Sequence, residues 1–416
     1  MTEDIPVDTP REPQALGVFA FPLGLLLLED GPDFEAVTAE LALGIFPREL
    51  PAEYRFLSLV QNQNLEAAYD EIRSDSFCAR YNRFVLSPSE QAYEALLRDS
   101  NSETRPLVES IGFMLGFTDE ISAPARSEGN MAAWIFSCLA ATEIAKGNPT
   151  RAQVHLLAGI DALDEKRAIF ASLLRVNYAQ LLKEDPGHIN DAIAMYEKAC
   201  PPLADSDLAQ ECAGAMLELG LCYQELGGRN PAKLKDAVRN YHGALLKIDK
   251  LTSPELYGAL QVNLALAYLA MPMIEASDAL RQAVAISSLK EALTVFDKVS
   301  HPQEWSNVQM NLANALVYLP SAHQGDNLVD AVERYEELLC FRDRVTDPIG
   351  FARIVVNQGN ALAHLGDFEH AKAKLHEARM IFEEFAMFDE VRTIRGLLDE
   401  IVKQSMNLER AENGIS

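Results

Sequence analysis

The feature that most limits how this chain can fold is a pair of amphipathic segments that recurs five times. The first member reads "RVNYAQLL", "LELGLCYQEL", "VNLALAYL", "MNLANALVYL" and "VNQGNALAHL", and its aligned positions recur every 41 to 48 residues. The second member follows each time, as "DAIAMYEKA", "DAVRNYHGA", "EALTVFDKV", "DAVERYEEL" and "HAKAKLHEA". Self-similarity at such a period, with breaks rich in Gly, Pro, Asn and Asp, is typical of arrays of helical hairpins. We therefore predict an all-α fold, with no strands from about Met131 onward.

Alignment of the five pairs shows which positions the hairpins share. One position of the first segment is always small: Ala179, Gly220, Ala265, Ala313 and Gly359. Three residues later the side chain is bulky: Leu182, Tyr223, Tyr268, Leu316 and Leu362. The second segment carries an alanine, a large residue four later and a smaller one three after that: Ala192/Tyr196/Ala199, Ala237/Tyr241/Ala244, Ala292/Phe296/Val299, Ala331/Tyr335/Leu338 and Ala371/Leu375/Ala378. This spacing places all three side chains on one helix face.

This arrangement resembles the tetratricopeptide repeat (TPR) family, in which the small residue lets the second helix approach the first. The resemblance implies a right-handed α-solenoid of about five to six hairpins. The last unit, "HLGDFEHAKAKLHEA", has the compact turn of the family's short repeat, whereas the others are longer. Longer units of this kind resemble the arrays that some bacterial proteins carry beside caspase-like protease domains.

The predicted domains follow from where the repeats begin and end. The array covers residues 131–385, including a weaker first hairpin at "MAAWIFSCLAATEIAKGNPTRAQVHLLAGIDAL". Residues 386–416 form a polar capping helix and tail, as expected for the exposed end of a solenoid. Residues 1–126 form an acidic helical domain that resembles no family, with a boundary at "SAPARSEGN". Within it, "SPSE" predicts a helix start near Ser87 or Ser89.

Charge and cysteine usage restrict the partners and the compartment. The net charge of −26 argues against nucleic acid, because a binder needs Lys and Arg to displace counterions from phosphate. The run "ALGVFAFPLGLLLLEDG" is too short for a membrane span and lacks the basic start of a signal peptide, so we expect a buried or docking segment. The six cysteines form no C-x-x-C pair, which favours buried thiols in a reducing, cytoplasmic setting.

The candidate site is a column of side-chain amides on the first helices. Asn177, Asn263, Asn311 and Asn357 share one repeat position, where the second unit has Glu218. Asn314 and Asn360 lie three residues later on the same face, as does Gln180 in the first unit. The resemblance implies that first helices line the concave surface, and this column resembles the asparagine ladder with which some family members hold an extended peptide. A carboxamide suits that task because it both donates and accepts.

Specificity would come from the residues one position before the amides: Val176, Leu217, Val262, Met310 and Val356. These side chains predict apolar contacts from the partner. Asn314, Asn357 and Arg353 also match positions of the family's carboxylate clamp for C-terminal peptides. Met310 stands where the first lysine of that clamp belongs, so capture of a terminal carboxylate is not predicted.

The same amides could instead have a structural role. They would then bond to the neighbouring hairpin and satisfy buried polar groups. His364, His370 and His376 are spaced by six residues and do not match a helical metal-ligand pair, so no metal or cofactor is predicted. The usual nucleophile and phosphate-binding motifs are missing from the sequence, so we do not predict an enzyme.

The function that these observations favour is a cytoplasmic, non-catalytic scaffold or adaptor that binds an extended segment of a partner protein in the groove. The front domain would then hold a second partner or the array's own groove. One alternative is a peptide-responsive regulator, for which the front third shows no basic recognition helix. Another is an accessory or assembly factor for an enzyme complex. No nucleic acid and no membrane insertion are expected, and self-association of the array is left open.

Overall fold

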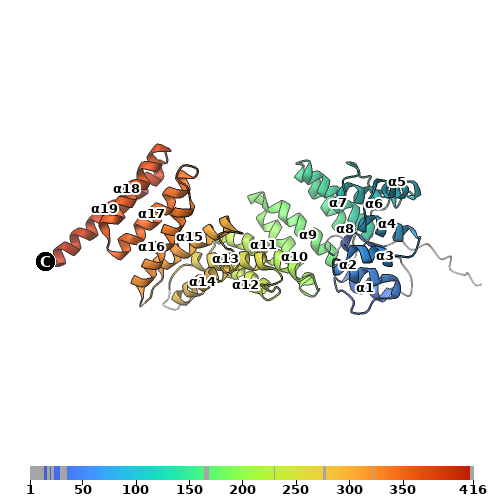
Figure 1. Ribbon diagram of the computed structural model, residues 1–416, viewed down its shortest axis with the longest axis horizontal. Coiled ribbons are helices and arrows are strands. Elements are labelled where there is room, and N and C mark those ends of the chain that lie inside the picture. The colour runs from blue at the N-terminus through green and yellow to red at the C-terminus, as the bar shows by residue number, and fades with distance from the viewer. Residues whose placement is uncertain are drawn as a thin grey trace, which may run out of the picture. The chain divides into compact units, whose positions relative to one another are not determined.

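The computed structural model describes residues 14–15, 19, 23–28, 35–163, 168–228, 230–274, 278–321 and 323–412. Nearly all of the described secondary structure is helical, as predicted (Figure 1). The chain divides into two compact units, Met1–Cys222 and Tyr223–Ser416, so the division falls inside helix α11 (Ala209–Gly227). The boundary predicted at residue 126 stays a prediction.

The first unit begins with short elements and continues with longer helices. Its described elements are β1 (Gln14–Ala15), η1 (Leu23–Leu25), β2 (Leu27–Leu28), α1 (Glu35–Ala42), η3 (Ala52–Tyr54), α2 (Arg55–Gln61), α3 (Leu65–Glu71), α4 (Phe77–Leu86), α5 (Glu90–Asp99), α6 (Arg105–Met114), α7 (Asn130–Ala145), α8 (Pro149–Asp161), α9 (Ala168–Lys183), η5 (Pro186–His188) and α10 (Ile189–Ala204). The predicted helix start is confirmed at Ser89, whose hydroxyl caps α5 by accepting the N–H of Ala92 at 3.3 Å. The predicted weak hairpin is also confirmed, as α7 packs against α8.

The apolar run near the N-terminus is buried over residues 23–28. Leu26, Leu27 and Leu28 are at most 1% exposed. The Asn82 side chain on α4 both donates to the carbonyl of Leu27 and accepts its N–H, each at 2.8 Å. β2 also pairs antiparallel with β1, so the fold includes one two-stranded sheet that the all-α prediction did not contain. A carboxamide can satisfy an extended backbone in this way because it presents a donor and an acceptor together.

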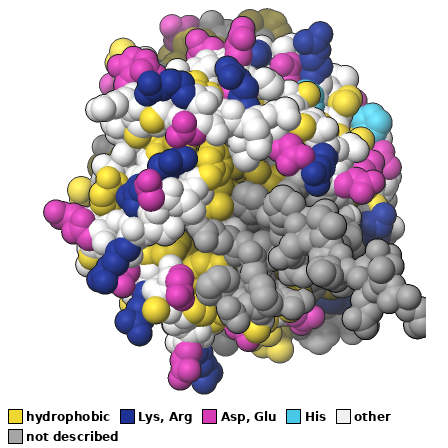
Figure 2. Space-filling view, turned by 90° about the vertical axis from the view of Figure 1, so that its right-hand side faces the viewer, with side chains coloured by type: hydrophobic (Ala, Val, Ile, Leu, Met, Phe, Trp, Pro, Cys, Tyr) yellow, Lys and Arg dark blue, Asp and Glu magenta, His cyan; other side chains and the backbone are white. Residues whose placement is uncertain are grey.

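The surface of this end of the molecule mixes both signs of charge. Figure 2 shows acidic and basic side chains interspersed on the face of the first unit that it presents, with apolar side chains between them. Several of the arginines in the first unit form ion pairs with nearby carboxylates, such as Arg80 with Asp99 at 3.2 Å and Arg126 with Glu103 at 2.7 Å. On the face that Figure 2 shows, acidic and basic side chains therefore alternate.

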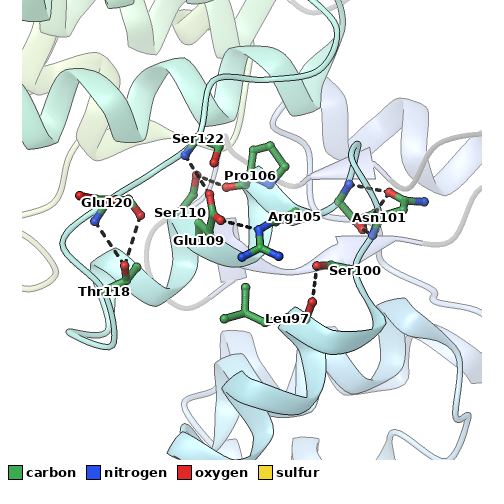
Figure 3. Close-up of polar contacts among 11 residues, drawn as sticks. Leu97, Ser100, Asn101, Arg105, Pro106, Glu109, Ser110, Thr118, Glu120 and Ser122 are labelled. Carbon is green, nitrogen blue, oxygen red and sulfur yellow. Dashed lines mark hydrogen bonds and ion pairs between the residues drawn. The ribbon is translucent and has the colours of Figure 1, made fainter.

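The connection from α6 to α7 is held by a carboxylate on α6 (Figure 3). Glu109 accepts the N–H of Ser122 at 2.8 Å and the guanidinium of Arg105 at 2.9 Å. Burial would raise the pKa of Glu109, but the hydrogen bonds from Ser122 and Arg105 outweigh it, so its pKa lies below the ordinary 4.5. The ionised carboxylate thus stabilises the folded loop.

We expect this loop to lose stability in acid. A carboxylate whose pKa is lowered by folding stabilises the protein above its unfolded pKa, and this contribution disappears as pH falls through the folded pKa. Glu109→Gln should therefore reduce the loss of thermal stability between about pH 5 and about pH 3. Glu94→Gln on α5 is the control, because Glu94 is exposed. An equal effect of both substitutions would contradict a special role for Glu109.

The second unit consists of the last part of α11 followed by α12 (Ala232–Leu245), α13 (Pro254–Ala270), α14 (Asp278–Ala292), α15 (Pro302–Tyr318), α16 (Gln324–Phe341), α17 (Pro348–Leu365), α18 (Phe368–Glu384) and α19 (Phe388–Glu412). Successive helices pack as antiparallel pairs, α13 on α14, α15 on α16 and α17 on α18 (Figure 1). The long α19 packs on α18 through Val391 and Ile394, as expected for a capping helix.

The small residues of the repeat lie where helices approach each other. Ala265, Ala313, Ala331 and Ala371 have no exposed surface. A Cβ added at Gly359 of α17 would lie only 3.3 Å from the carbonyl oxygen of Ala371 on α18. The prediction of an array of TPR-like helical hairpins is therefore confirmed by the packing.

One predicted second helix was wrong in position. The triad Ala292/Phe296/Val299 was expected on a helix, but α14 ends at Ala292, and Val299 is 90% exposed in the loop beyond it. The residues that occupy the shared positions are Ala285, Leu289 and Ala292, all with no exposed surface. Two runs with similar spacing overlap in "AVAISSLKEALTVFDKV", and only the upstream run lies on the helix α14 and is buried at all three positions.

The corrected register shows that the connections between hairpins are alike. Asp249, Asp297 and Asp343 stand at the same position after α12, α14 and α16, and each side chain accepts the N–H two residues later, at 2.6 to 2.8 Å. Backbone N–H groups of Ser300 and Val299 lower the pKa of Asp297. The next residue pairs with a glutamate on the second helix of the following hairpin: Lys250 with Glu291, Lys298 with Glu337 and Arg344 with Glu377.

Two truncations test the corrected register. Leu289→Ala should destabilise the protein by about 2–5 kcal/mol, because it opens a cavity in the core. Val299→Ala should change stability by less than about 0.5 kcal/mol, because that side chain is exposed. Urea unfolding followed by circular dichroism measures both. A larger loss for Val299→Ala than for Leu289→Ala would restore the register that the sequence suggested.

Candidate functional site

The structure places most of the predicted amides on adjacent first helices of the second unit. Asn263 lies on α13, Asn311 and Asn314 on α15, and Asn357 and Asn360 on α17, and all five are half-buried. Helices α15 and α17 contact each other directly. Asn177, by contrast, lies on α9 in the first unit, where its side chain is exposed.

Three contacts join the exposed faces of α15 and α17. The Asn357 amide donates to the Met310 sulfur at 3.5 Å, and the Asn360 amide donates to the Tyr318 hydroxyl at 2.9 Å. The rings of Tyr318 and His364 meet edge to face, with centroids 5.8 Å apart. We call this surface the α15–α17 seam, and its residues are Met310, Asn311, Tyr318, Asn357, Asn360 and His364.

The amides of the seam differ in how many of their donors and acceptors already form hydrogen bonds. No hydrogen bond joins the Asn311 side chain to another described residue, so both its donor and its acceptor face solvent or a ligand. Asn357 and Asn360 each use the amide nitrogen within the seam, which leaves their carbonyl oxygens to accept. Tyr318 is 60% exposed and, since it accepts from Asn360, its own O–H remains able to donate.

Asn314 has a different environment and points to a structural role. Its side-chain oxygen accepts the hydroxyl of Tyr335 at 2.6 Å, and Tyr335 is only 1% exposed. Burial raises the pKa of Tyr335, because the charged phenolate would lose its solvation. The Asn263 amide similarly donates within its own helix, to the carbonyl of Ala259 at 2.9 Å. These two amides serve the hairpin in which they lie.

The remaining predicted residues differ in exposure, and of them Met310 belongs to the seam. Met310, Val262 and Val356 are half-buried and pack against the core, so they offer only part of their apolar surface. Arg353 is exposed on α17.

In the first unit, the position that corresponds to the amides carries a charged residue. Glu218 on α11, which stands at the amide position, forms an ion pair with Lys183 on α9. Both side chains are partly buried, with 24% and 29% exposure. A charged pair therefore joins these two first helices, where the second unit has amides and an aromatic ring.

The first helices of the second unit are nearly free of charge. α13 contains only Glu255, α15 only Glu304 and α17 only Arg353 among Asp, Glu, Lys and Arg. The second helices α14, α16 and α18 carry several charges each. In a chain of net charge −26, this segregation matches the composition of interface cores, which are depleted in charged residues and enriched in Tyr and Met.

Sequence reasoning missed Tyr318 and His364 as parts of this surface. Both stand at one repeat position, two helical turns beyond Asn311 and Asn357, so the alignment itself carried the signal. His364 drew attention only for its spacing to His370. The structure places His364 on α17 beside Tyr318, whereas His370 on α18 contacts Asp367 at 2.8 Å.

The remaining chemical features of the described residues do not form a second site. In that part of the chain, no cluster of three His, Cys, Asp or Glu side chains could hold a metal, and no helix is both long and apolar enough to cross a bilayer. The prediction of buried thiols is confirmed for Cys78, Cys138, Cys200, Cys212 and Cys222 but wrong for Cys340, which is exposed. A cavity of about 390 Å³ lies beside α3 and α4, and the amide of Asn82 at its wall is already bonded to Leu27.

Comparison with known proteins finds similar folds only among structures. Neither a protein-family model nor a curated protein matches the sequence. The C-terminal part of a TPR repeat-containing protein from Cytophaga hutchinsonii is 13% identical, with a TM-score of 0.42 over 70% of this chain and 94% of that one. A Rap protein complexed with competence and sporulation factor is 10% identical, with a TM-score of 0.41 over 88% and 98%. The TPR2AB domain of yeast Sti1, in a complex with pHSP90, is 16% identical, with a TM-score of 0.25 over 66% and 100%.

The fold class is thus an all-α array of TPR-like helical hairpins, as the packing of the small residues shows. Identities and TM-scores of this size transfer neither a ligand nor a partner to this chain.

A double-mutant cycle distinguishes the role of Asn314 from that of Asn311. Asn314→Ala should destabilise the protein by about 1–3 kcal/mol, because it leaves the buried Tyr335 hydroxyl without an acceptor. The cost should fall when Tyr335→Phe removes that hydroxyl as well. Asn311→Ala, the matched control on the same helix, should cost less than about 0.5 kcal/mol. Equal costs for Asn314→Ala in both backgrounds would contradict the hydrogen bond as the cause.

Proposed function

We propose that the chain is a non-catalytic scaffold or adaptor whose second unit binds an extended segment of a partner protein along its first helices. The observation that carries the proposal is the α15–α17 seam, where amide and hydroxyl groups keep part of their hydrogen-bonding capacity on helices almost without charge. An extended peptide presents N–H and C=O groups alternately, and Asn311 can bond to both kinds.

The apolar neighbours support a protein partner over a small polar ligand. Met310 and Val356 flank the amides and expose part of their side chains. Burying apolar surface contributes roughly 25 cal/mol per Å², and the amide hydrogen bonds would fix the register of the segment.

The test is a comparison of proteins captured from the native lysate. The bait is the wild-type chain or the Asn311→Ala/Asn357→Ala variant. Each lost hydrogen bond should weaken binding by about 1–3 kcal/mol, so the true partner should be depleted in the variant sample. Calorimetric titration of the identified partner then measures the loss directly.

Asn240→Ala is the matched control for this experiment. Asn240 lies on the second helix α12, and its amide donates to the carbonyl of Asp236 at 2.9 Å in its own helix. Its replacement should leave the partner bound. Circular dichroism confirms that all three proteins remain folded. Unchanged affinity of the folded double variant would contradict the proposed site.

A further inference from the structure

The seam also restricts the chemistry of the segment that it can hold, an inference that rests on the proposed function. The groups left free along it are the Asn311 amide, the carbonyl oxygens of Asn357 and Asn360, and the hydroxyl hydrogen of Tyr318. Two of these four groups can only accept, and the backbone N–H groups of an extended segment are the donors that such a ligand presents to Asn357 and Asn360. Proline has no N–H and would leave those oxygens without a donor.

The lack of charge on the seam disfavours ionised side chains in the part of the ligand that lies on it. None of the six seam residues is Asp, Glu, Lys or Arg. A charged ligand side chain laid on the seam would lose water without gaining an ion pair, which is costly. Glu255 and Glu304 lie in the first turns of α13 and α15, before the seam begins, and Arg353 lies one turn before Asn357. Charges on the partner therefore fit only outside this stretch.

Tyr318 provides the specific contact at one end. Its ring is held by the bond from Asn360 and by the edge-to-face contact with His364, yet 60% of the residue is exposed. A ring fixed in this way loses little entropy on binding and offers an apolar face. From Asn357 to His364 the helix rises about 10 Å, the length of about three extended residues.

We propose that the α15–α17 seam is a subsite for an uncharged, proline-free core of about three extended residues in the partner, with an apolar side chain against the ring of Tyr318. Tyr318 is then a specificity-determining residue, and Asn311 and Asn357 hold the backbone. Selectivity comes from the absence of compensating charge among the six seam residues and from the fixed ring.

Panning of a displayed library of random dodecapeptides against the full-length chain tests this inference. In sequences enriched by the wild type over the Asn311→Ala/Asn357→Ala variant, Asp, Glu, Lys, Arg and Pro should each fall about tenfold below their library frequency within a short core. Tyr318→Ala should keep the dependence on the amides but lose the preference for an apolar residue at one end of that core. Leu365→Ala, which removes a neighbouring side chain that is 36% exposed, is the control for a nonspecific loss of apolar surface.

The outcomes separate the two proposals. Charged residues or proline at library frequency in the enriched core would overturn the inference while the scaffold function stands. Retention of the apolar preference by Tyr318→Ala would overturn the role of that ring. No enrichment by the wild type over the double variant would contradict the proposed function itself, and with it the subsite. Thermal unfolding of each variant shows whether a loss reflects misfolding.

Discussion

The close approach of paired helices at small residues is the constraint on which the rest of the array depends. Ala313 on α15 and Ala331 on α16 have no exposed surface, and Gly359 leaves little room for a Cβ beside Ala371. Larger side chains at these positions would separate the helices and expose the apolar residues that fill each hairpin. With the pairs held this tightly, consecutive hairpins can stack alike, and the first helices α15 and α17 come into contact.

The connections between hairpins add a second constraint in the second unit. An aspartate closes each loop, and the cation beside it reaches the next second helix, as Lys298 reaches Glu337 at 3.2 Å. Lys298 also lies 4.7 Å from the ring centre of Trp305, so its position is set by more than one partner. Exposed ion pairs contribute little stability each, and their part here is to orient one hairpin on the next. The α15–α17 seam is a consequence of that orientation.

The sequence was sufficient to predict the helical pairs, the small-residue positions and the column of amides, because these follow from periodicity and side-chain size. It was not sufficient to place α14, where Ala285 and Ala292 offered two registers with similar spacing. Burial decided between them, and burial depends on contacts with α13 that periodicity does not show. The two short strands near the N-terminus escaped prediction for the same reason, since their pairing joins residues far apart in an apolar run.

The sequence predicted which positions of the candidate site carry amides but not which hydrogen bonds each amide forms. Nothing in the sequence distinguishes Asn314 from Asn311, yet the first is committed to the buried hydroxyl of Tyr335 and the second is not. The difference arises because Asn314 faces the second helix of its own hairpin, where the large shared position holds a tyrosine. In the last hairpin that position holds Leu375, which needs no acceptor, and Asn360 instead reaches Tyr318 on the preceding first helix. In these two hairpins, the residue at the large position of the second helix thus decides whether the amide opposite it is bonded inside the hairpin or lies on the surface of the first helices.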